Sequence, residues 1–172
     1  SISTAFGCPF EGEVAPEKIY ALVDQFIELG FDGVTIADTT GMANPKQVRE
    51  LMTEIAKRYS DIELTLHFHN TRGMGLANVL AGLEAGVVSY DASLGGLGGC
   101  PFAPGASGNI CTEDLVHMLE SMGYNTGVNL DRLLKAARKV SGIVGHEVPG
   151  QVLKAGKSTD LHSLSSVSSS AG

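Results

Sequence analysis

The strongest constraint on the fold is a repeated pattern, in which a short apolar or β-branched run is followed by an amphipathic helix. The apolar runs occupy residues 2–6, 33–37, 62–69 and 87–93. Strands that alternate with helices at a spacing of about 25 to 30 residues are typical of parallel βα units. Parallel strands also need helices on their faces. The sequence therefore predicts an α/β fold built from four parallel βα units.

Proline, glycine and asparagine mark where the predicted helices begin and end. Pro16 suits a first helical turn and Gly30 suits the end of the same helix, whereas Asn44 and Pro45 open the next one. Apolar residues at helical spacing predict helices over residues 16–29, 45–56, 73–84, 112–122 and 130–140.

Four βα units fit either a doubly wound sheet or half of an eight-stranded barrel. A complete (β/α)8 barrel takes about 250 residues, and this chain has 172. The chain also begins inside the first apolar run, which we interpret as a truncation. We expect one domain over residues 1–156, and the Ser-rich segment 157–172 is predicted to be disordered.

Composition excludes several classes of function. The sequence has 12 Lys and Arg against 19 Asp and Glu, a formal charge of -7, which disfavours nucleic-acid binding. No apolar stretch is long enough to cross a membrane. The three cysteines, Cys8, Cys100 and Cys111, are odd in number and form no CxxC pair, which favours a reducing compartment without disulfides.

Polar residues stand where two of the predicted strands end. Side chains alternate along a strand, so His67 and His69 are predicted to share one face, about 6.5 to 7 Å apart along the strand. Such a pair either binds a metal ion or is a structural pair. Asp38 ends the preceding strand at the same edge, where parallel α/β folds bind ligands. It is either a loop residue or a general base.

A long glycine-rich segment, residues 95–109, follows the fourth strand. Loops of this length in compact α/β domains are usually functional, and a plain linker is the alternative. Cys100 within it could transfer a proton or be inert, and Asn109 could cap the next helix or ligate a metal. Glu113 and Asp114 fall in that helix's first turn, where negative charge complements the helix dipole.

Together these residues resemble the 3-hydroxy-3-methylglutaryl-CoA lyases, members of the metal-dependent TIM-barrel lyases. The resemblance runs from about residue 3 to residue 140. The His-x-His pair is widespread in the superfamily, whereas the glycine-rich loop is specific to the lyase branch. The segments that carry the resemblance are Gly7-Cys8-Pro9, Asp38-Thr39-Thr40-Gly41, His67-Phe68-His69, residues 95–109 and Thr112-Glu113-Asp114-Leu115.

The resemblance implies a divalent cation, Mg²⁺ or Mn²⁺, held by His67, His69 and Asn109 together with an aspartate from the first barrel strand. That aspartate belongs to an Arg-Asp-Gly segment, which this sequence lacks. The implied reaction cleaves 3-hydroxy-3-methylglutaryl-CoA to acetyl-CoA and acetoacetate. Asp38 would be the base, assisted by His67, and Cys100 would protonate the departing enolate. The chain would then be strands five to eight of a TIM barrel plus C-terminal helices.

Several further expectations follow from the truncation and from the resemblance. The isolated chain should be nearly inactive and should bind metal weakly, since its three ligands are neutral. Exposed strand edges predict a homo-oligomer or a complex with the missing N-terminal half-barrel. The substrate would be an acyl-CoA, and the location bacterial cytoplasm or mitochondrial matrix. The alternatives are a synthase or aldolase of the same superfamily acting on 2-oxo acids, and a non-catalytic half-barrel binding module.

Overall fold

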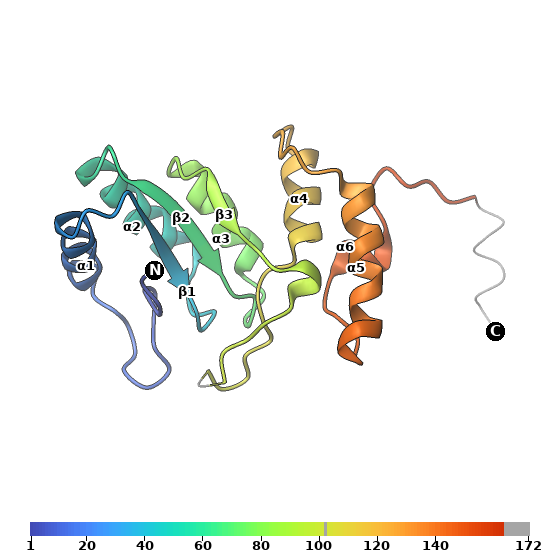
Figure 1. The fold of residues 1–172 in the computed structure, drawn as a ribbon, viewed down its shortest axis with the longest axis horizontal. Helices are drawn as coiled ribbons and strands as arrows, with labels where there is room; N and C mark the ends of the chain where they lie inside the picture. Colours follow the sequence, from blue (N-terminus) through green and yellow to red (C-terminus); the bar gives the residue numbers. More distant parts are fainter. Residues whose placement is uncertain (102, 164–172) are drawn as a thin grey trace.

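The computed structural model describes residues 1–101 and 103–163, and its centre is a three-stranded parallel sheet. The strands are β1 (Gly33–Asp38), β2 (Glu63–Phe68) and β3 (Ser89–Asp91), in the order β1-β2-β3. Their carboxyl ends point toward the lower edge of Figure 1, where the connecting loops gather. The predicted α/β class with a parallel sheet is therefore confirmed.

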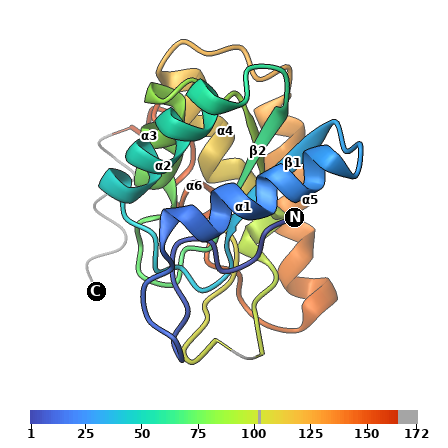
Figure 2. The same cartoon turned by 90° about the vertical axis from the view of Figure 1, so that its left-hand side faces the viewer.

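Three helices cover one face of this sheet: α1 (Pro16–Glu28), α2 (Pro45–Arg58) and α3 (Gly75–Glu84). Figure 2 shows α2 and α3 side by side, with α1 running below them in this view. The predicted opening of α2 is confirmed by a capping box. The Asn44 side chain accepts from the Gln47 N–H, and the Gln47 side chain accepts from the Asn44 N–H.

The remaining helices form a second group beside the β3 edge of the sheet (Figure 1). They are the short 3-10 turn η1 (Leu94–Gly96), α4 (Thr112–Ser121), α5 (Leu130–Val144) and α6 (Gln151–Ala155). These helices have a small apolar core of their own. Its buried residues are Val116, Leu130, Leu134 and Val152.

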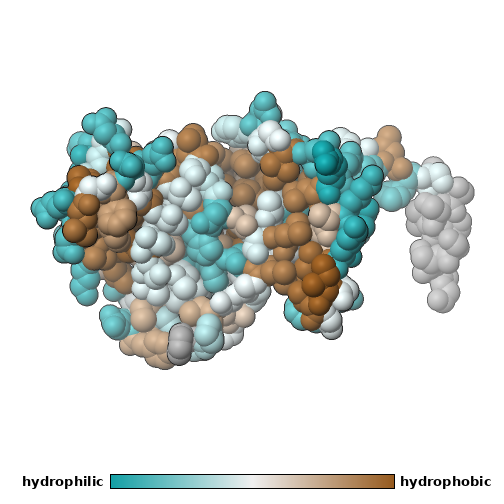
Figure 3. Space-filling model, in the orientation of Figure 1, coloured by the Kyte–Doolittle hydropathy of each residue, from teal (hydrophilic) through white to brown (hydrophobic). Residues whose placement is uncertain are grey.

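The two faces of the sheet differ in polarity. Leu66 and Phe68 are fully buried in the main apolar core, which includes residues of α1, α2 and α3. The residues between them point to the other face, where no helix of the described chain packs. The aligned strands place Thr35, Thr65 and Ser89 in one row there, followed by Ala37, His67 and Asp91. Figure 3 shows this side of the sheet as pale to teal, that is, neutral to hydrophilic.

The prediction of four strands is wrong. Residues 2–6 contribute only an isolated parallel bridge between Ile2 and Ile36, because Thr4 adopts a positive φ of 54° and turns the chain out of the extended conformation. The fourth run, residues 87–93, yields only the three residues of β3, since the Val87 N–H still bonds to the end of α3. A barrel of strands five to eight is therefore not what the described residues form.

The C-terminal segment is partly folded onto α5. The Lys157 ammonium lies 2.6 Å from a carboxylate oxygen of Asp131 and also approaches Asp160. The disorder over residues 157–172 stays a prediction, and residues 164–172 lie outside the described residues. No helix among the described residues is long and apolar enough to cross a membrane.

Candidate active site

The two histidines share one face of β2, as predicted. Their ring centroids are 5.1 Å apart, with the rings inclined at 63°. His69 is buried, and its Nδ1 has no hydrogen-bond partner. Burial lowers the pKa of the His69 imidazole, and the neighbouring His67 acts in the same direction. The buried imidazole is therefore favoured as a neutral ring with a lone pair to offer.

The glycine-rich loop returns to the end of β2 and brings Asn109 beside His69. The two residues form an isolated antiparallel bridge, and the Asn70 N–H donates to the Gly108 carbonyl at 2.9 Å. This pairing joins residues forty positions apart. His67, His69 and Asn109 therefore lie together at the carboxyl ends of the strands.

The Asn109 amide is held in one orientation. Its Nδ2 donates to the Leu97 carbonyl at 2.6 Å, which leaves Oδ1 buried and without a partner. A side chain at Gly98 would meet Nδ2 at 2.5 Å, and Gly98 has a φ of +100°. Only glycine permits this close approach. The cap interpretation of Asn109 is wrong, because the residue that precedes α4 is Cys111.

One carboxylate oxygen of Asp38 accepts a hydrogen bond within the loop that follows β1, and the other has no partner. Its Oδ1 accepts from the Met42 N–H at 2.8 Å, whereas Oδ2 is buried without a partner. Burial raises the pKa of the Asp38 carboxyl, and the Met42 N–H and the Arg72 guanidinium partly offset this. Arg72 itself donates to the Thr40 and Gly41 carbonyls at 3.1 Å. The free oxygen can therefore accept a proton.

The structure places Cys100 within the glycine-rich loop. Cys100 is partly buried, and no hydrogen bond in the described chain joins its Sγ to His67, His69, Asn109 or Asp38. Cys111 lies deeper, and burial raises the pKa of its thiol to about 12. Of the two thiols, Cys100 is the accessible one.

Sequence reasoning missed the contacts of Glu113 and Asp114. Glu113 is fully buried, and its Oε2 accepts from the Gly95 N–H at 3.0 Å. Asp114 accepts from the Gln151 and Val152 N–H groups at 2.9 and 2.7 Å. The two carboxylates thus fasten the start of the glycine-rich loop and the start of α6 to α4. Only their position directly after the loop hinted at this role.

The donor set fits a divalent cation with weak intrinsic affinity. Three buried acceptors without partners lie at the strand ends, namely Asp38 Oδ2, His69 Nδ1 and Asn109 Oδ1. Such atoms are costly unless something binds them. Within the part of the chain that is described, no group of three or more His, Cys, Asp or Glu could hold an ion. Two of these atoms belong to the ligands that the resemblance implies, which are His67, His69 and Asn109, two imidazoles and one amide without a carboxylate.

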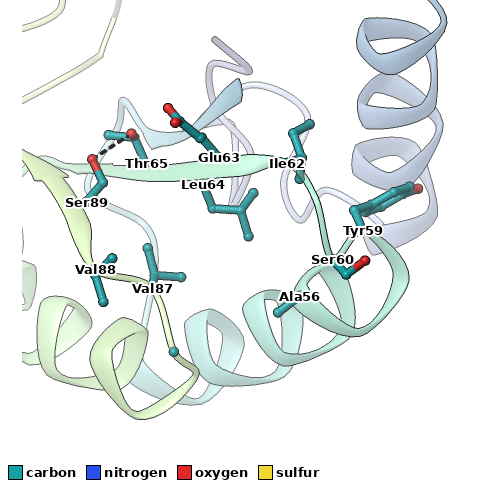
Figure 4. Close-up of a pocket in the computed structure, with 11 residues that line it drawn as sticks. Ala56, Tyr59, Ser60, Ile62, Glu63, Leu64, Thr65, Val87, Val88 and Ser89 are labelled. Carbon is teal, nitrogen blue, oxygen red and sulfur yellow. Dashed lines mark hydrogen bonds between the residues drawn. The ribbon is translucent and has the colours of Figure 1, made fainter. Parts of the chain in front are cut away.

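A second hollow lies at the opposite ends of the strands. This cavity of about 510 Å³ opens between the first halves of β2 and β3. Figure 4 shows Leu64 and Val87 pointing into it, beneath the hydrogen bond of 2.9 Å between the Thr65 and Ser89 hydroxyls. Its lining contains no histidine or cysteine. It is also far from the ligand-binding edge expected of parallel sheets.

Comparisons with known proteins identify relatives of this chain. The chain is 47% identical over 156 residues to the (R)-citramalyl-CoA lyase of Chloroflexus aurantiacus, covering 91% of this chain and 49% of that protein. It is 43% identical over 158 residues to the hydroxymethylglutaryl-CoA lyase YngG of Bacillus subtilis, covering 92% and 53%. The chain thus spans about half the length of the curated relatives it matches.

A solved structure is similar as well. It is an HMG-CoA lyase from Acinetobacter baumannii in complex with coenzyme A and 3-methylmalate, with a TM-score of 0.89 and 52% identity. The match covers 94% of this chain and 53% of that one.

The family model named HMGL-like matches residues 1–140, the N-terminal part of this chain. These findings do not support the expected assignment of the chain to the C-terminal half of a barrel. They do support the resemblance on which the expected chemistry rests, and the chain belongs to the HMGL-like family.

Proposed function

We propose that this chain carries part of the active site of a carbon–carbon lyase that cleaves 3-hydroxy-3-methylglutaryl-CoA to acetyl-CoA and acetoacetate. One observation carries the proposal. Buried acceptors without partners on Asp38, His69 and Asn109 gather at the carboxyl ends of β1 and β2. The names of the relatives and the bound coenzyme A of the A. baumannii enzyme support an acyl-CoA as the substrate.

A divalent cation, Mg²⁺ or Mn²⁺, fits this chemistry. Lyases of the family depend in general on a divalent metal. His67, His69 and Asn109 would hold the ion, which when bound would polarise the substrate's hydroxyl and carboxylate oxygens. The Leu97 carbonyl prepares Asn109 for this role by fixing its amide.

Asp38 and Cys100 would move the protons. Asp38 Oδ2 takes the proton of the C3 hydroxyl, because Oδ1 is already engaged by the Met42 N–H. The electron pair of the C2–C3 bond then passes to the thioester as an enolate, and C3 becomes the ketone of acetoacetate. Cys100 gives its proton to C2 of the enolate, which completes acetyl-CoA. His67 would assist Asp38 as one of the ligands of the cation, whose positive charge would favour the Asp38 carboxylate.

A neighbouring substrate is the second candidate, and the citramalyl-CoA lyase relative favours it. Citramalyl-CoA would break at the corresponding bond, giving acetyl-CoA and a 2-oxo acid instead of acetoacetate. The same base, acid and metal ligands would serve both reactions. The two substrates differ in the group attached to the hydroxyl-bearing carbon, so they compete for one site.

The chain needs a complementary segment for activity. It lacks an Arg-Asp-Gly segment, and its three candidate ligands bring no charge to the ion. The open polar face of the sheet would be covered by that segment or by another copy of the chain, which could also pair with β3, the last strand of the described sheet. The isolated chain is therefore expected to self-associate and to show almost no turnover. A bacterial cytoplasm or a mitochondrial matrix would suit such an enzyme.

Coexpression tests the proposal. The chain is produced with the segment of the B. subtilis YngG lyase that the match leaves uncovered, and the copurified pair is assayed with Mn²⁺ on both CoA thioesters. Turnover of 3-hydroxy-3-methylglutaryl-CoA by the pair, its loss in a pair carrying His69→Ala, and inactivity of the chain alone support the lyase. A stable pair without turnover on either substrate would favour the binding module. Faster cleavage of citramalyl-CoA would favour the second candidate.

A further inference from the structure

Asp91 is a side chain at the strand ends that neither the motifs nor the proposed mechanism use. It is the last residue of β3, and the strand register pairs it directly with His67 of β2. The His67 Nδ1 and the Asp91 Oδ1 are in hydrogen-bond contact. About half of the Asp91 side chain remains exposed. The contact is thus built by the sheet itself, on the face that carries both histidines.

This contact determines which nitrogen of His67 carries the proton. A carboxylate only accepts hydrogen bonds, so His67 Nδ1 must be the donor. In the neutral ring the lone pair then lies on Nε2. A carboxylate that fixes a ligating histidine in this manner also raises its basicity. Asp91 therefore prepares one defined nitrogen of His67 for a cation.

Asp91 also supplies the charge that the ligands lack. None of the candidate ligands His67, His69 and Asn109 is a carboxylate. The Asp91 carboxylate lies against Nδ1 of His67, behind that ligand. An anion next to a ligating imidazole strengthens cation binding without occupying a coordination position itself.

We propose that Asp91 is a positioning residue of the metal site, which holds His67 in the Nδ1-protonated tautomer and supplies negative charge behind the neutral ligands. This inference rests on the proposed metal-dependent function. It predicts that the tautomer is already fixed in the metal-free protein. The partial exposure of Asp91 makes its substitution compatible with folding.

Two variants separate the two roles. Asp91→Asn keeps a carbonyl oxygen that accepts from Nδ1–H but removes the charge, whereas Asp91→Ala removes both. Asp131→Ala is the matched control, because Asp131 is an exposed carboxylate on α5 that pairs with Lys157. All four proteins are measured under the same conditions, at pH 8.

The first measurement is the His67 tautomer, read from the nitrogen chemical shifts of the metal-free, ¹⁵N-labelled chain. The wild type, Asp91→Asn and Asp131→Ala should show one Nδ1-protonated ring. Asp91→Ala should show a mixture of tautomers. A single Nδ1-protonated ring in Asp91→Ala, or a mixture in the wild type, overturns the proposal.

The second measurement is Mn²⁺ affinity by titration calorimetry on the same proteins. Removing an outer hydrogen-bond partner of a metal ligand costs about 10- to 100-fold in affinity, and Asp91→Ala should fall in that range. Asp91→Asn should lose less, and Asp131→Ala should lose nothing. Unchanged affinity in Asp91→Ala overturns the charge role. Absence of Mn²⁺ binding by the wild type would instead defeat the proposed function, and the tautomer measurement would still decide the role of Asp91.

Discussion

The two faces of β2 have different roles, although their side chains alternate along a strand of six residues. Leu66 and Phe68 are fully buried against the helices, where they specify how the sheet packs. Thr65 and His67 point to the open face, where the row of polar residues continues onto β3. The buried face thus depends on volume and shape, whereas the open face depends on which polar atoms lie opposite one another. Substitutions on the two faces should therefore have separable effects.

The difference has a physical origin in what each side chain loses when the chain unfolds. Phe68 leaves a dense apolar environment, so its contribution appears in the free energy of unfolding. His67 leaves a partly buried position, 26% exposed, with one polar partner, and its contribution to stability is smaller than that of Phe68. The chemistry of the open face is therefore nearly independent of the stability of the fold.

The largest expected effect is on the buried face. Phe68→Ala should lower the free energy of unfolding by about 3–5 kcal/mol, because it opens a cavity in the main core. His67→Ala on the opposite face should change it by only about 1 kcal/mol. Urea denaturation of the two variants measures the contrast. Equal losses would show that the faces are not separable.

Metal affinity, unlike stability, should depend on the polar residues at the strand ends. His69→Ala and Asn109→Ala each remove a candidate ligand, so each should weaken Mn²⁺ binding by more than the roughly 10- to 100-fold expected for losing an outer partner. Thr65→Val, on the same open face, should leave the affinity unchanged. Calorimetric titration of the three variants gives the comparison. Wild-type affinity in either ligand variant would remove that residue from the site.

Much of the helical part of this fold can be predicted from the sequence, because its signals are local. Pro45 after Asn44 opens α2, and the apolar spacing from Val48 to Ile55 gives its buried side. The strand expected over residues 2–6 was predicted wrongly, since an extended conformation there would need pairing along its whole length. The only bridge of this segment to β1 joins Ile2 to Ile36, because Thr4 turns the chain away.

The site divides in the same way. Alternation along one strand predicts that His67 and His69 share a face, and the ring contact confirms it. The sequence could not predict the partner of each side chain, because those partners are distant in the chain. Asp91 becomes visible only through the register of β3 on β2. Asn109 becomes visible only when the loop returns to β2.

An intermediate effect is expected where the loop meets the sheet. A side chain at Gly108 would lie 2.4 Å from the Gly96 carbonyl oxygen, and Gly108 has a φ of +105°. Gly108→Ala should therefore destabilise the fold by about 1–3 kcal/mol and displace Asn109 from His69, which weakens Mn²⁺ binding too. Gly99→Ala is the control, because nothing lies within 4 Å of an added Cβ there. Unchanged stability and affinity in Gly108→Ala would contradict the packed loop.

The smallest expected effect is a difference in cysteine reactivity between the glycine-rich loop and the start of α4. Its measurement requires no substitution. Only the thiolate reacts with iodoacetamide, and the pKa of Cys111 is raised to about 12 by its burial and by the nearby Asp114. Cys111 should therefore stay unmodified at pH 8 in the native chain, whereas Cys100, which is partly exposed, should be alkylated. Mass spectrometry of the peptides reports both sites. Alkylation in urea should label both cysteines, and equal native labelling would show that the base of α4 opens as readily as the loop.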